Sequence, residues 1–544
     1  EDVYIGTSCV IEENVIIEQG AELKDLTSIQ AGTHIKVNEI WDGSPGQMIG
    51  VVNPAELDPQ STASPARQTT MTFLYTIMVL AIPPFSLLPL FPSFWVFDRV
   101  DDLIGIADID RTLYLLSIPL MAWPTSFVMV IITVGLIAMF RWTILPRVKE
   151  GTYSIHSWFY FRKWTLALTI EIMLEVLSSL FATVYMRAWY RLMGANIGKD
   201  AEISANLGGR YDLVEIGEKC FIADEVVLGD EDIRRGWMYL KSVKTGARVF
   251  VGNDGVVPPG AEIPTGALIG IKSKPPANEL MSPGDTWFGS PPIKLPVRQR
   301  YDTGTNWTYE PPAWKKFARA VFEAVHISLP TMLFITFGTW AVEFLAPPLL
   351  THRYFQLVVI FIICSVLISL ALVGVCIIVK WLTMGRYEPM VRPMWSWWAM
   401  RTEAVAVMYW GMGAKVLLDH LKGTPFLPWI LRLFGTRFGQ GCYVDMTDIT
   451  EFDCVSVGNF VSLNALSALQ THLYEDRVMK VGRVHVEDGV TVGAGSTVLY
   501  DTKIGQYARL GPLTVVMKGE EIPPHSEWIG APAVPPRMAR AQQA

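Results

Sequence analysis

Apolar residues recur at a strict period of six at both ends of the chain. The first ladder runs unbroken from Ile5 to Ile35, and the second runs from Val457 to Val516 with a single interruption. Neither an α-helix nor a flat strand has this period. A period of six is typical of a left-handed parallel β-helix, in which each turn is a triangle of three short strands and every sixth side chain points inward. The pattern therefore predicts hexapeptide-repeat β-helices.

One short motif follows each ladder. Trp41-Asp-Gly-Ser-Pro45 returns as Trp287-Phe-Gly-Ser-Pro291 and again as Trp528-Ile-Gly-Ala-Pro532. Because the first ladder is already under way at the first residue, we expect the chain to be the C-terminal part of a larger protein. Three such terminators predict three β-helix domains, which are residues 1–53, 193–300 and 435–540.

The second and third β-helix domains align at a constant offset of 241 residues, which pairs Ile216 with Val457 and Val251 with Val492. Such self-similarity indicates a repeated module. We expect the three β-helices to pack side by side as an internal pseudo-trimer, either alone or within a homo-oligomer. In that arrangement His472 should lie between two of them.

Pairs of long apolar segments separate the β-helix domains. No charged residue occurs from Gln68 to Phe97 or from Thr112 to Phe140, and each stretch is long enough to cross a bilayer. Prolines in the first stretch predict a kinked or broken helix. The predicted fold class is thus mixed membrane and β, with tandem left-handed parallel β-helices set between pairs of transmembrane helices. The four predicted spans are residues 68–97, 112–140, 324–351 and 354–379.

The charges beside the spans predict their orientation. Acidic residues dominate the loop between the first two spans, whereas lysine and arginine follow the second span. The positive-inside rule therefore predicts an integral membrane protein whose β-helices face the cytosol. The juxtamembrane segments, residues 141–192 and 380–434, mix apolar and charged residues and are expected to form helices along the bilayer surface.

Composition excludes several other functions. The net charge is only −7, and no basic run interleaves with aromatic residues, so no nucleic-acid partner is expected. The six cysteines are scattered without zinc-ligand spacing, so neither a metal site nor a disulfide framework is predicted.

The interruption of the last ladder, from Asn464 to Lys480, carries His472. An excursion from a rigid coil is a typical position for chemistry. A histidine of near-neutral pKa can take a proton from an incoming nucleophile and return it to a leaving group. We therefore predict His472 and Glu475 as catalytic residues, and the resemblance described below adds Asn464 to them. The offset of 241 pairs His472 with Glu231, so the second domain is predicted to be a structural or docking copy.

Acidic residues surround the predicted base in the sequence. Glu475 and Asp476 follow His472, where they either orient the imidazole, hold a cationic amine, or form a solvated loop. A second acidic strip precedes it, and this strip is either exposed coil surface or a subsite for a positively charged acceptor. With Asp476, the predicted substrate-binding residues are Asp445, Asp448, Glu451 and Asp453.

At these residues the chain resembles a known family. The resemblance is to the C-terminal region of membrane-bound nonribosomal peptide synthetases of the ε-poly-L-lysine synthetase type, and it covers essentially the whole chain. The block QTHLYEDRVMK around His472 is specific. The segments that carry the resemblance are GTPFLPWILRLFG, YVDMTDITEFDCVSVG, LNALSALQTHLYEDRVMK and VVMKGEEIPP.

The resemblance implies adenylation and carrier domains upstream in the same polypeptide. ATP would be used only at that adenylation domain, and the phosphopantetheine arm of the carrier would present a thioester of an amino acid, lysine in the ε-poly-lysine type. The tandem domains would then join this aminoacyl group to an amine acceptor, repeatedly, to make a homopoly(amino acid). By position, the resemblance implies His472 as general base, with Asn464, Asp445, Glu451, Glu475 and Asp476 as lesser candidates.

Two other functions remain open on the sequence alone. The chain is alternatively a membrane O- or N-acyltransferase that uses coenzyme A thioesters, or a non-catalytic platform that docks carriers and exports product. Glu343 within a predicted span either faces a path for the product or lies at the membrane interface.

Overall fold

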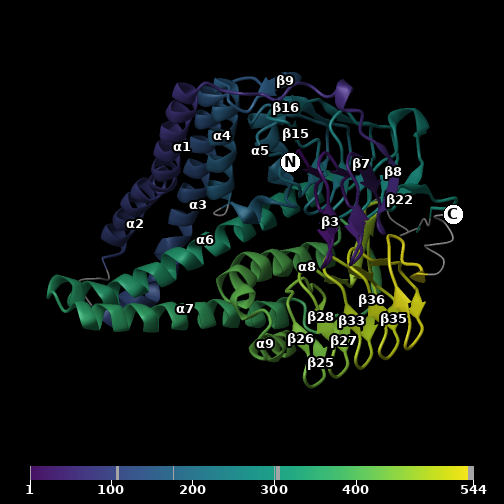
Figure 1. Ribbon diagram of the computed structural model, residues 1–544. Helices are drawn as coiled ribbons and strands as arrows, with labels where there is room; N and C mark the ends of the chain where they lie inside the picture. Colours follow the sequence, from purple (N-terminus) through teal and green to yellow (C-terminus); the bar gives the residue numbers. More distant parts are fainter. Residues whose placement is uncertain (1, 106–109, 175–176, 299–300, 302–306, 537–544) are drawn as a thin grey trace.

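The computed structural model describes residues 2–105, 110–174, 177–298, 301 and 307–536, and all statements below concern these residues (Figure 1). Four predicted segments extend beyond them. The residues that lie outside the described ones are residue 1 of the first domain, 299–300 of the second, 537–540 of the third, and 175–176 of the first juxtamembrane segment.

Short parallel strands stack into a coil in the N-terminal part of the chain. Tyr4 pairs with Glu22, 18 residues later, so one turn of the coil has three sides of six residues each. Leu23, Ile29 and Ile35 are buried inside it, which explains the period of six in the sequence. The strands are β1 (Tyr4–Ile5), β2 (Val10–Ile11), β3 (Ile16–Ile17), β4 (Glu22–Leu23), β5 (Ser28–Ile29), β6 (His34–Ile35), β7 (Glu39–Asp42) and β8 (Gln47–Val51).

A second and a third coil of stacked parallel strands follow the same plan, which fits the predicted hexapeptide-repeat β-helix. The second contains β10 (Asn196–Ile197), β11 (Glu202–Ile203), β12 (Val214–Ile216), β13 (Phe221–Ile222), β14 (Val227–Leu228), β17 (Val243–Thr245), β18 (Phe250–Val251), β19 (Val256–Val257), β20 (Glu262–Ile263), β21 (Leu268–Ile269), β22 (Thr286–Phe288) and β23 (Ile293–Lys294). The third contains β25 (Arg437–Phe438), β26 (Tyr443–Val444), β27 (Val455–Val457), β28 (Ser462–Leu463), β29 (Ala468–Gln470), β32 (Val484–Val486), β33 (Thr491–Val492), β34 (Thr497–Leu499), β35 (Thr502–Ile504), β36 (Arg509–Leu510), β37 (Val515–Val516), β38 (Glu521–Ile522) and β39 (Glu527–Trp528).

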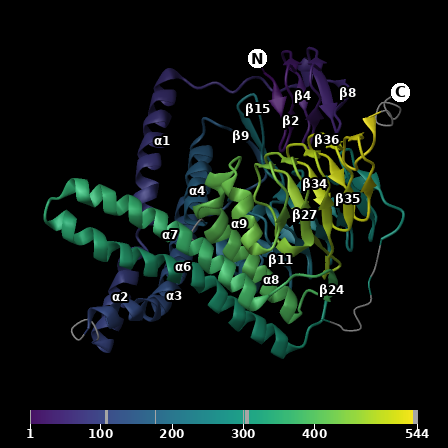
Figure 2. The same ribbon diagram turned by 90° about the horizontal axis from the view of Figure 1, so that it is seen from below.

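The three terminators contact one another, so the ends of the three coils lie together (Figures 1 and 2). The backbone N–H of Ser44 donates to the carbonyl of Ser290 at 2.7 Å, and the N–H of Ala531 donates to the carbonyl of Ser44 at 3.1 Å. Gly289, with φ of +94°, approaches the carbonyl of Ala531 so closely that a Cβ at this position would lie 2.3 Å from that oxygen. Glycine is therefore required at this contact.

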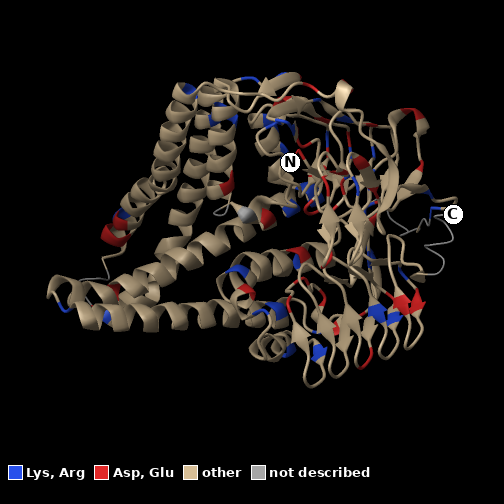
Figure 3. Ribbon diagram, viewed as in Figure 1, with Lys and Arg blue, Asp and Glu red and all other residues tan. Residues whose placement is uncertain are grey.

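Four stretches of helix are long and apolar enough to cross a membrane, which matches the number of predicted spans. The prolines break the first of them, as the sequence predicts, between Ser86 and Leu90. Figure 3 shows that charged residues are concentrated on the β-helices and nearly absent from these long helices. The helices are α1 (Pro65–Ser86) with α2 (Leu90–Ile104), α3 (Arg111–Ile144), α6 (Ala313–Leu350) and α7 (Tyr354–Thr383).

The two helical pairs run in different directions, α1 and α3 on one side and α6 with α7 crossing beneath them (Figure 1). On α7, Phe355, Phe361 and Leu382 are exposed. An uncovered apolar face of this kind fits association with a lipid bilayer. Glu343 on α6 lies 3.6 Å from Arg111 at the start of α3, which places it at the end of a span rather than along a central path.

The juxtamembrane helices differ from the expectation. Each helix predicted for these segments is broken into shorter helices. A hydrophobicity pattern does not reveal where a helix stops and restarts, so the sequence did not predict these breaks. Furthermore, α4 runs beside α1 and α3, where the ring of Trp164 packs against Tyr75 at 4.7 Å, rather than across the ends of the spans (Figure 1). The segments are α4 (Trp158–Leu174) and α5 (Val184–Leu192), then α8 (Trp397–Met408), a π-helical turn (Tyr409–Ala414) and α9 (Phe426–Phe434).

The same buried ion pair joins the helices to the coil in both modules. Arg141 at the end of α3 contacts Asp212 at 2.5 Å, and Lys380 at the end of α7 contacts Asp453 at 2.6 Å. Asp212 and Asp453 are related by the 241-residue offset, so the repeat found in the sequence extends to the contacts between its parts.

Candidate functional site

The interruption of the hexads in the third coil is an antiparallel hairpin. Its strands are β30 (His472–Glu475) and β31 (Val478–Val481), and Asp476 and Arg477 form the turn with φ of 52° and 59°. Two successive positive φ angles are typical of the tight turns that match the twist of a hairpin. On its other edge β31 pairs with β24 (Met390–Pro393) from the juxtamembrane segment. The hairpin is thus held on both sides, with His472 at the point where it leaves the coil.

A second contact fixes the hairpin against the helices. The hydroxyl of Tyr474 donates to Glu403 of α8 at 2.7 Å, and Glu403 lies 3.9 Å from the fully buried Arg319 of α6. Arg319 also contacts Glu202 of the second coil at 2.7 Å. One buried network therefore connects the first turns of α6, the second coil and the strand that carries His472.

The imidazole of His472 meets a buried carboxylate. Nδ1 of His472 lies 2.8 Å from Oε2 of Glu451, whose side chain is only 1% exposed. The same oxygen accepts hydrogen bonds from the hydroxyls of Thr450, at 2.8 Å, and Thr471, at 2.7 Å. The other oxygen accepts from Thr402 of α8 at 3.3 Å. Because an ionised carboxylate only accepts, Nδ1 carries the proton and Nε2 carries the lone pair.

Electrostatics strengthens this nitrogen as a base. Burial alone would lower the pKa of His472, but the charge and hydrogen bond of Glu451, together with Asp224 and Glu403, raise it above its ordinary value. Burial alone would raise the pKa of Glu451, but His472 and the two threonine hydroxyls lower it. The His472 side chain is 17% exposed, and within the described part of the chain Nε2 has no hydrogen-bond partner. It is therefore available to receive a proton.

Carboxylates of the second coil face this pair. Loss of water around their carboxylates, together with the charge of Asp254, raises the pKa of Asp224 and of Glu225. From the third coil, Asp448 has its pKa raised to about 7 by burial and then by Asp254 and Glu225. Lys272 offsets part of this charge, because its Nζ lies 3.2 Å from Asp254. Crowded carboxylates whose charges repel one another favour an additional cation among them.

Only some of the predicted site residues lie near the imidazole of His472. Glu451 contacts the imidazole directly, although its predicted role was to bind substrate. Asp448 lies within the acidic surroundings of the pair. Glu475 contacts Lys480 and, at 2.7 Å, Lys518, so its carboxylate is engaged away from the imidazole.

The remaining four predicted residues make other contacts, and none of these, in the part of the chain that the structure describes, is with His472. Asp453 anchors Lys380 and accepts the backbone N–H of Tyr387. The other three contacts are those of Asp476 with Arg298, Asn464 with the carbonyl of Val492 at 2.7 Å, and Asp445 with the hydroxyl of Tyr443 at 3.4 Å.

Several residues at the site were not predicted. Thr450 and Thr471 adjoin predicted residues, so a search for hydroxyls beside Glu451 and His472 would have found them. Thr402 comes from the juxtamembrane helix, and the sequence carries no signal for its position. The same holds for the residues of the second coil, which are Asp224, Glu225 and Asp254.

The second coil contains the same cluster with its charges reversed. The 241-residue offset pairs Glu451 with Arg210 and His472 with Glu231. Arg210 donates to Glu231 at 2.7 Å, and Lys163 of α4 donates to its other oxygen at 2.5 Å. An ion pair therefore stands where the third coil has its acid and imidazole, as the pairing of His472 with Glu231 in the sequence indicates.

No family model matches this chain. One curated relative matches nearly its whole length. The relative is a delta-poly-L-ornithine synthetase from Acinetobacter baumannii, which is 39% identical over 540 residues. The match covers 98% of this chain but 40% of the relative, so the chain spans about two fifths of that protein's length.

Solved structures match only locally. A hexapeptide-repeat acetyltransferase from Vibrio cholerae is 17% identical, with 19% of this chain and 62% of that chain covered and a TM-score of 0.17. A serine acetyltransferase from Neisseria gonorrhoeae in complex with serine is 19% identical, with 33% and 75% covered and a TM-score of 0.15. Scores this low carry no argument about function. Over nearly its whole length, the chain is thus similar to one part of a poly(amino acid) synthetase.

Proposed function

We propose that this chain forms amide bonds by transferring an aminoacyl group from a thioester to an amine acceptor, and that the monomer is a basic diamino acid such as lysine or ornithine. The observation that carries the proposal is the contact between Glu451 and His472, beside carboxylates of both coils. The sequence similarity to a delta-poly-L-ornithine synthetase supports the substrate class.

The reaction begins with a proton transfer. The acceptor is an ammonium at neutral pH, since a lysine-type amine has an ordinary pKa of about 10.4, and nearby carboxylates raise it further. Asp448 and Asp224 therefore attract and hold the cation, while removal of its proton falls to Nε2 of His472. The neutral amine nitrogen then attacks the carbonyl carbon of the thioester.

The second half of the reaction regenerates the base. As the C–N bond forms, the C–S bond breaks, and the imidazolium returns its proton to the departing thiolate. The attacking nitrogen also loses its second proton, which the freed Nε2 accepts and passes to solvent. The products are therefore an amide, a thiol and one released proton, and His472 is neutral again. Glu451 is a positioning residue, because it fixes the tautomer through Nδ1 and stabilises the imidazolium without touching the acceptor.

We propose that the donor is a thioester on the phosphopantetheine arm of a carrier domain and that the β-helices meet this carrier on the cytosolic side of the bilayer. The arm is a substrate for this chain. ATP is consumed in a separate adenylation step.

The proposal is tested with the purified chain in detergent, an aminoacyl-pantetheine thioester of ornithine or lysine, and the same amino acid as acceptor. Amide formation is followed by mass spectrometry and thiol release by a colorimetric reagent, and equal amounts of the two products are expected. Acetyl-coenzyme A serves as the competing donor. Preferential use of acetyl-coenzyme A would identify the chain as a coenzyme A acyltransferase, and product formation from neither donor would favour a docking platform.

A further inference from the structure

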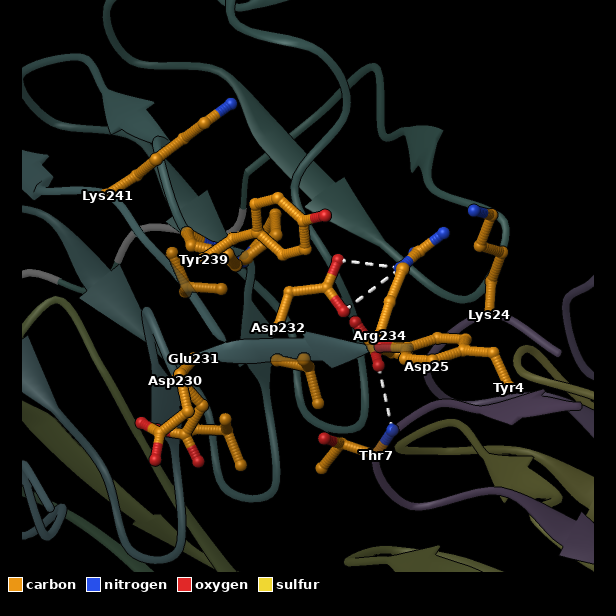
Figure 4. Close-up of a pocket in the computed structure, with 15 residues that line it drawn as sticks. Tyr4, Thr7, Lys24, Asp25, Asp230, Glu231, Asp232, Arg234, Tyr239 and Lys241 are labelled. Atoms are coloured by element: carbon orange, nitrogen blue, oxygen red, sulfur yellow. Dashed lines mark hydrogen bonds and ion pairs between the residues drawn. The ribbon is translucent and has the colours of Figure 1, made fainter. Parts of the chain in front are cut away.

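A pocket of about 470 Å³ opens between the first and second coils (Figure 4). Its walls come from the N-terminal coil, through residues such as Tyr4 and Asp25, and from the second coil and its hairpin, β15 (Asp232–Arg234) and β16 (Trp237–Leu240). This volume is in the range of small-molecule sites.

The pocket is the internal counterpart of the His472 site. It includes Glu231, which the offset pairs with His472, so it lies at the same place on the second coil as His472 on the third. Burial would raise the pKa of Glu231, but Lys163 and Arg210 lower it, and these two cations occupy both of its oxygens. A molecule held here would meet no imidazole at the equivalent position, so we expect it to be bound without being transformed.

Side chains of both charges line the pocket. Figure 4 shows Lys241 at the upper left and Lys24 at the right, with Asp232 in the centre and Asp230 at the lower left. Many of these charges are already neutralised. Asp232 is held by Arg234 through two contacts of 2.9 and 3.0 Å, and Lys24 contacts Glu22 at 3.0 Å.

Two opposite charges at the pocket have no ion-pair partner among the described residues. Asp25 only accepts the backbone N–H of Thr7, at 2.8 Å, and Lys241 is exposed. Val227, Val256 and Pro258 also line the pocket and give it an apolar part. This arrangement complements a ligand that has an ammonium at one end, a carboxylate at the other and methylene groups between them.

We propose that this pocket binds a zwitterionic basic diamino acid, free or as the carboxyl end of a short oligomer. Its amine would contact Asp25 and its carboxylate would contact Lys241. The proposal concerns a site separate from His472, so this inference and the proposed function fail independently.

The experiment is calorimetric titration of the detergent-purified chain with L-ornithine in an Asp448→Asn background, which weakens binding at the His472 site. Asp25→Asn keeps the size of the side chain and its acceptor oxygen for Thr7, and Lys241→Gln changes an exposed side chain. Each variant is expected to raise the Kd for ornithine about tenfold, which corresponds to about 1.4 kcal/mol of binding free energy. The matched control is Lys244→Gln, on the next strand and paired with Glu262 at 3.5 Å outside the pocket. It should leave the affinity unchanged.

Ligand variants complete the test. Putrescine, which lacks the carboxylate, should bind more weakly and should not respond to Lys241→Gln. Comparison of the affinities of tri-ornithine and ornithine distinguishes binding of the carboxyl end of an oligomer from binding of the free amino acid. The inference would be overturned by an unchanged affinity in both pocket variants, or by equal binding of putrescine and ornithine. If Asp25→Asn does not fold, the affinity of Lys241→Gln alone decides the inference.

Discussion

His472 and Glu451 lie 21 residues apart in the third coil, and their side chains meet at 2.8 Å. The contact depends on the coil, because the backbone N–H of Glu451 donates to the hydroxyl of Thr471, next to the start of the hairpin, at 3.3 Å. It also depends on threonines from three segments, which hold the carboxylate in place. The predictions below follow from this pair and its surroundings.

The pH dependence of the reaction should depend on Glu451. The raised pKa of His472 means that the unaltered protein loses activity as pH falls through a midpoint above about 6.5, where the imidazole becomes protonated. In Glu451→Gln the raising charge is absent and burial remains, so the midpoint of this limb should move to lower pH. The maximal rate should also fall, because the imidazolium is no longer stabilised. The measurement is the pH profile of single-turnover amide formation, and an unmoved midpoint would exclude Glu451 from this role.

Thr402 should contribute modestly by holding the second oxygen of Glu451. Its removal in Thr402→Val costs one hydrogen bond, about 0.5–1.5 kcal/mol, which corresponds to a rate about 2- to 12-fold lower. The matched control Thr402→Ser keeps the hydroxyl and should retain the rate. Equal rates in both variants would show that the contact at 3.3 Å has no influence on the reaction.

Asp448 should govern the binding of cationic acceptors. Because its pKa is raised to about 7, it gains its charge as pH rises from 6 to 8, and the KM for a diamino acid acceptor should fall over that range. Asp448→Asn should raise this KM and remove its pH dependence, with little change for an acceptor that has one amine and no second cation. A KM that rises equally for both acceptors would argue against a charge-specific role.

The ion pair between Lys380 of α7 and Asp453 of the third coil should affect the stability of the protein rather than the reaction. Lys380→Met leaves the carboxylate of Asp453 buried without its cation, and loss of one partner of such a pair costs about 3–5 kcal/mol. The double variant Lys380→Met with Asp453→Leu should recover much of this loss. Thermal unfolding in detergent measures both, and a double variant no more stable than the single one would contradict the explanation.

The sequence predicted the coils well because their period is a direct result of geometry. A turn of 18 residues returns every sixth side chain to the interior, and Leu23, Ile29 and Ile35 show it. The sequence also allowed His472 to be predicted as a site residue, because a hairpin has to interrupt that period. The offset of 241 residues further indicated that Glu231 replaces it in the second coil.

Other features required the folded structure. Glu475 is close to His472 in sequence, but residues three apart on a strand point to opposite faces, so its carboxylate reaches Lys518 instead. The contributions of Asp224 and Thr402 depend on which faces of the coils and helices pack together. Residues from different modules carry no sequence pattern that pairs them, so the acidic surroundings of the site emerge only in three dimensions.

The central claim is that His472 is the base, and single-turnover amide formation from an aminoacyl-pantetheine thioester by His472→Ala tests it most directly. The matched control is His485→Ala, which alters an exposed histidine on β32 of the same coil. The account predicts a rate about 10²- to 10⁴-fold lower in folded His472→Ala, the usual contribution of a general base, and an unchanged rate in His485→Ala. An undiminished rate in His472→Ala would contradict it.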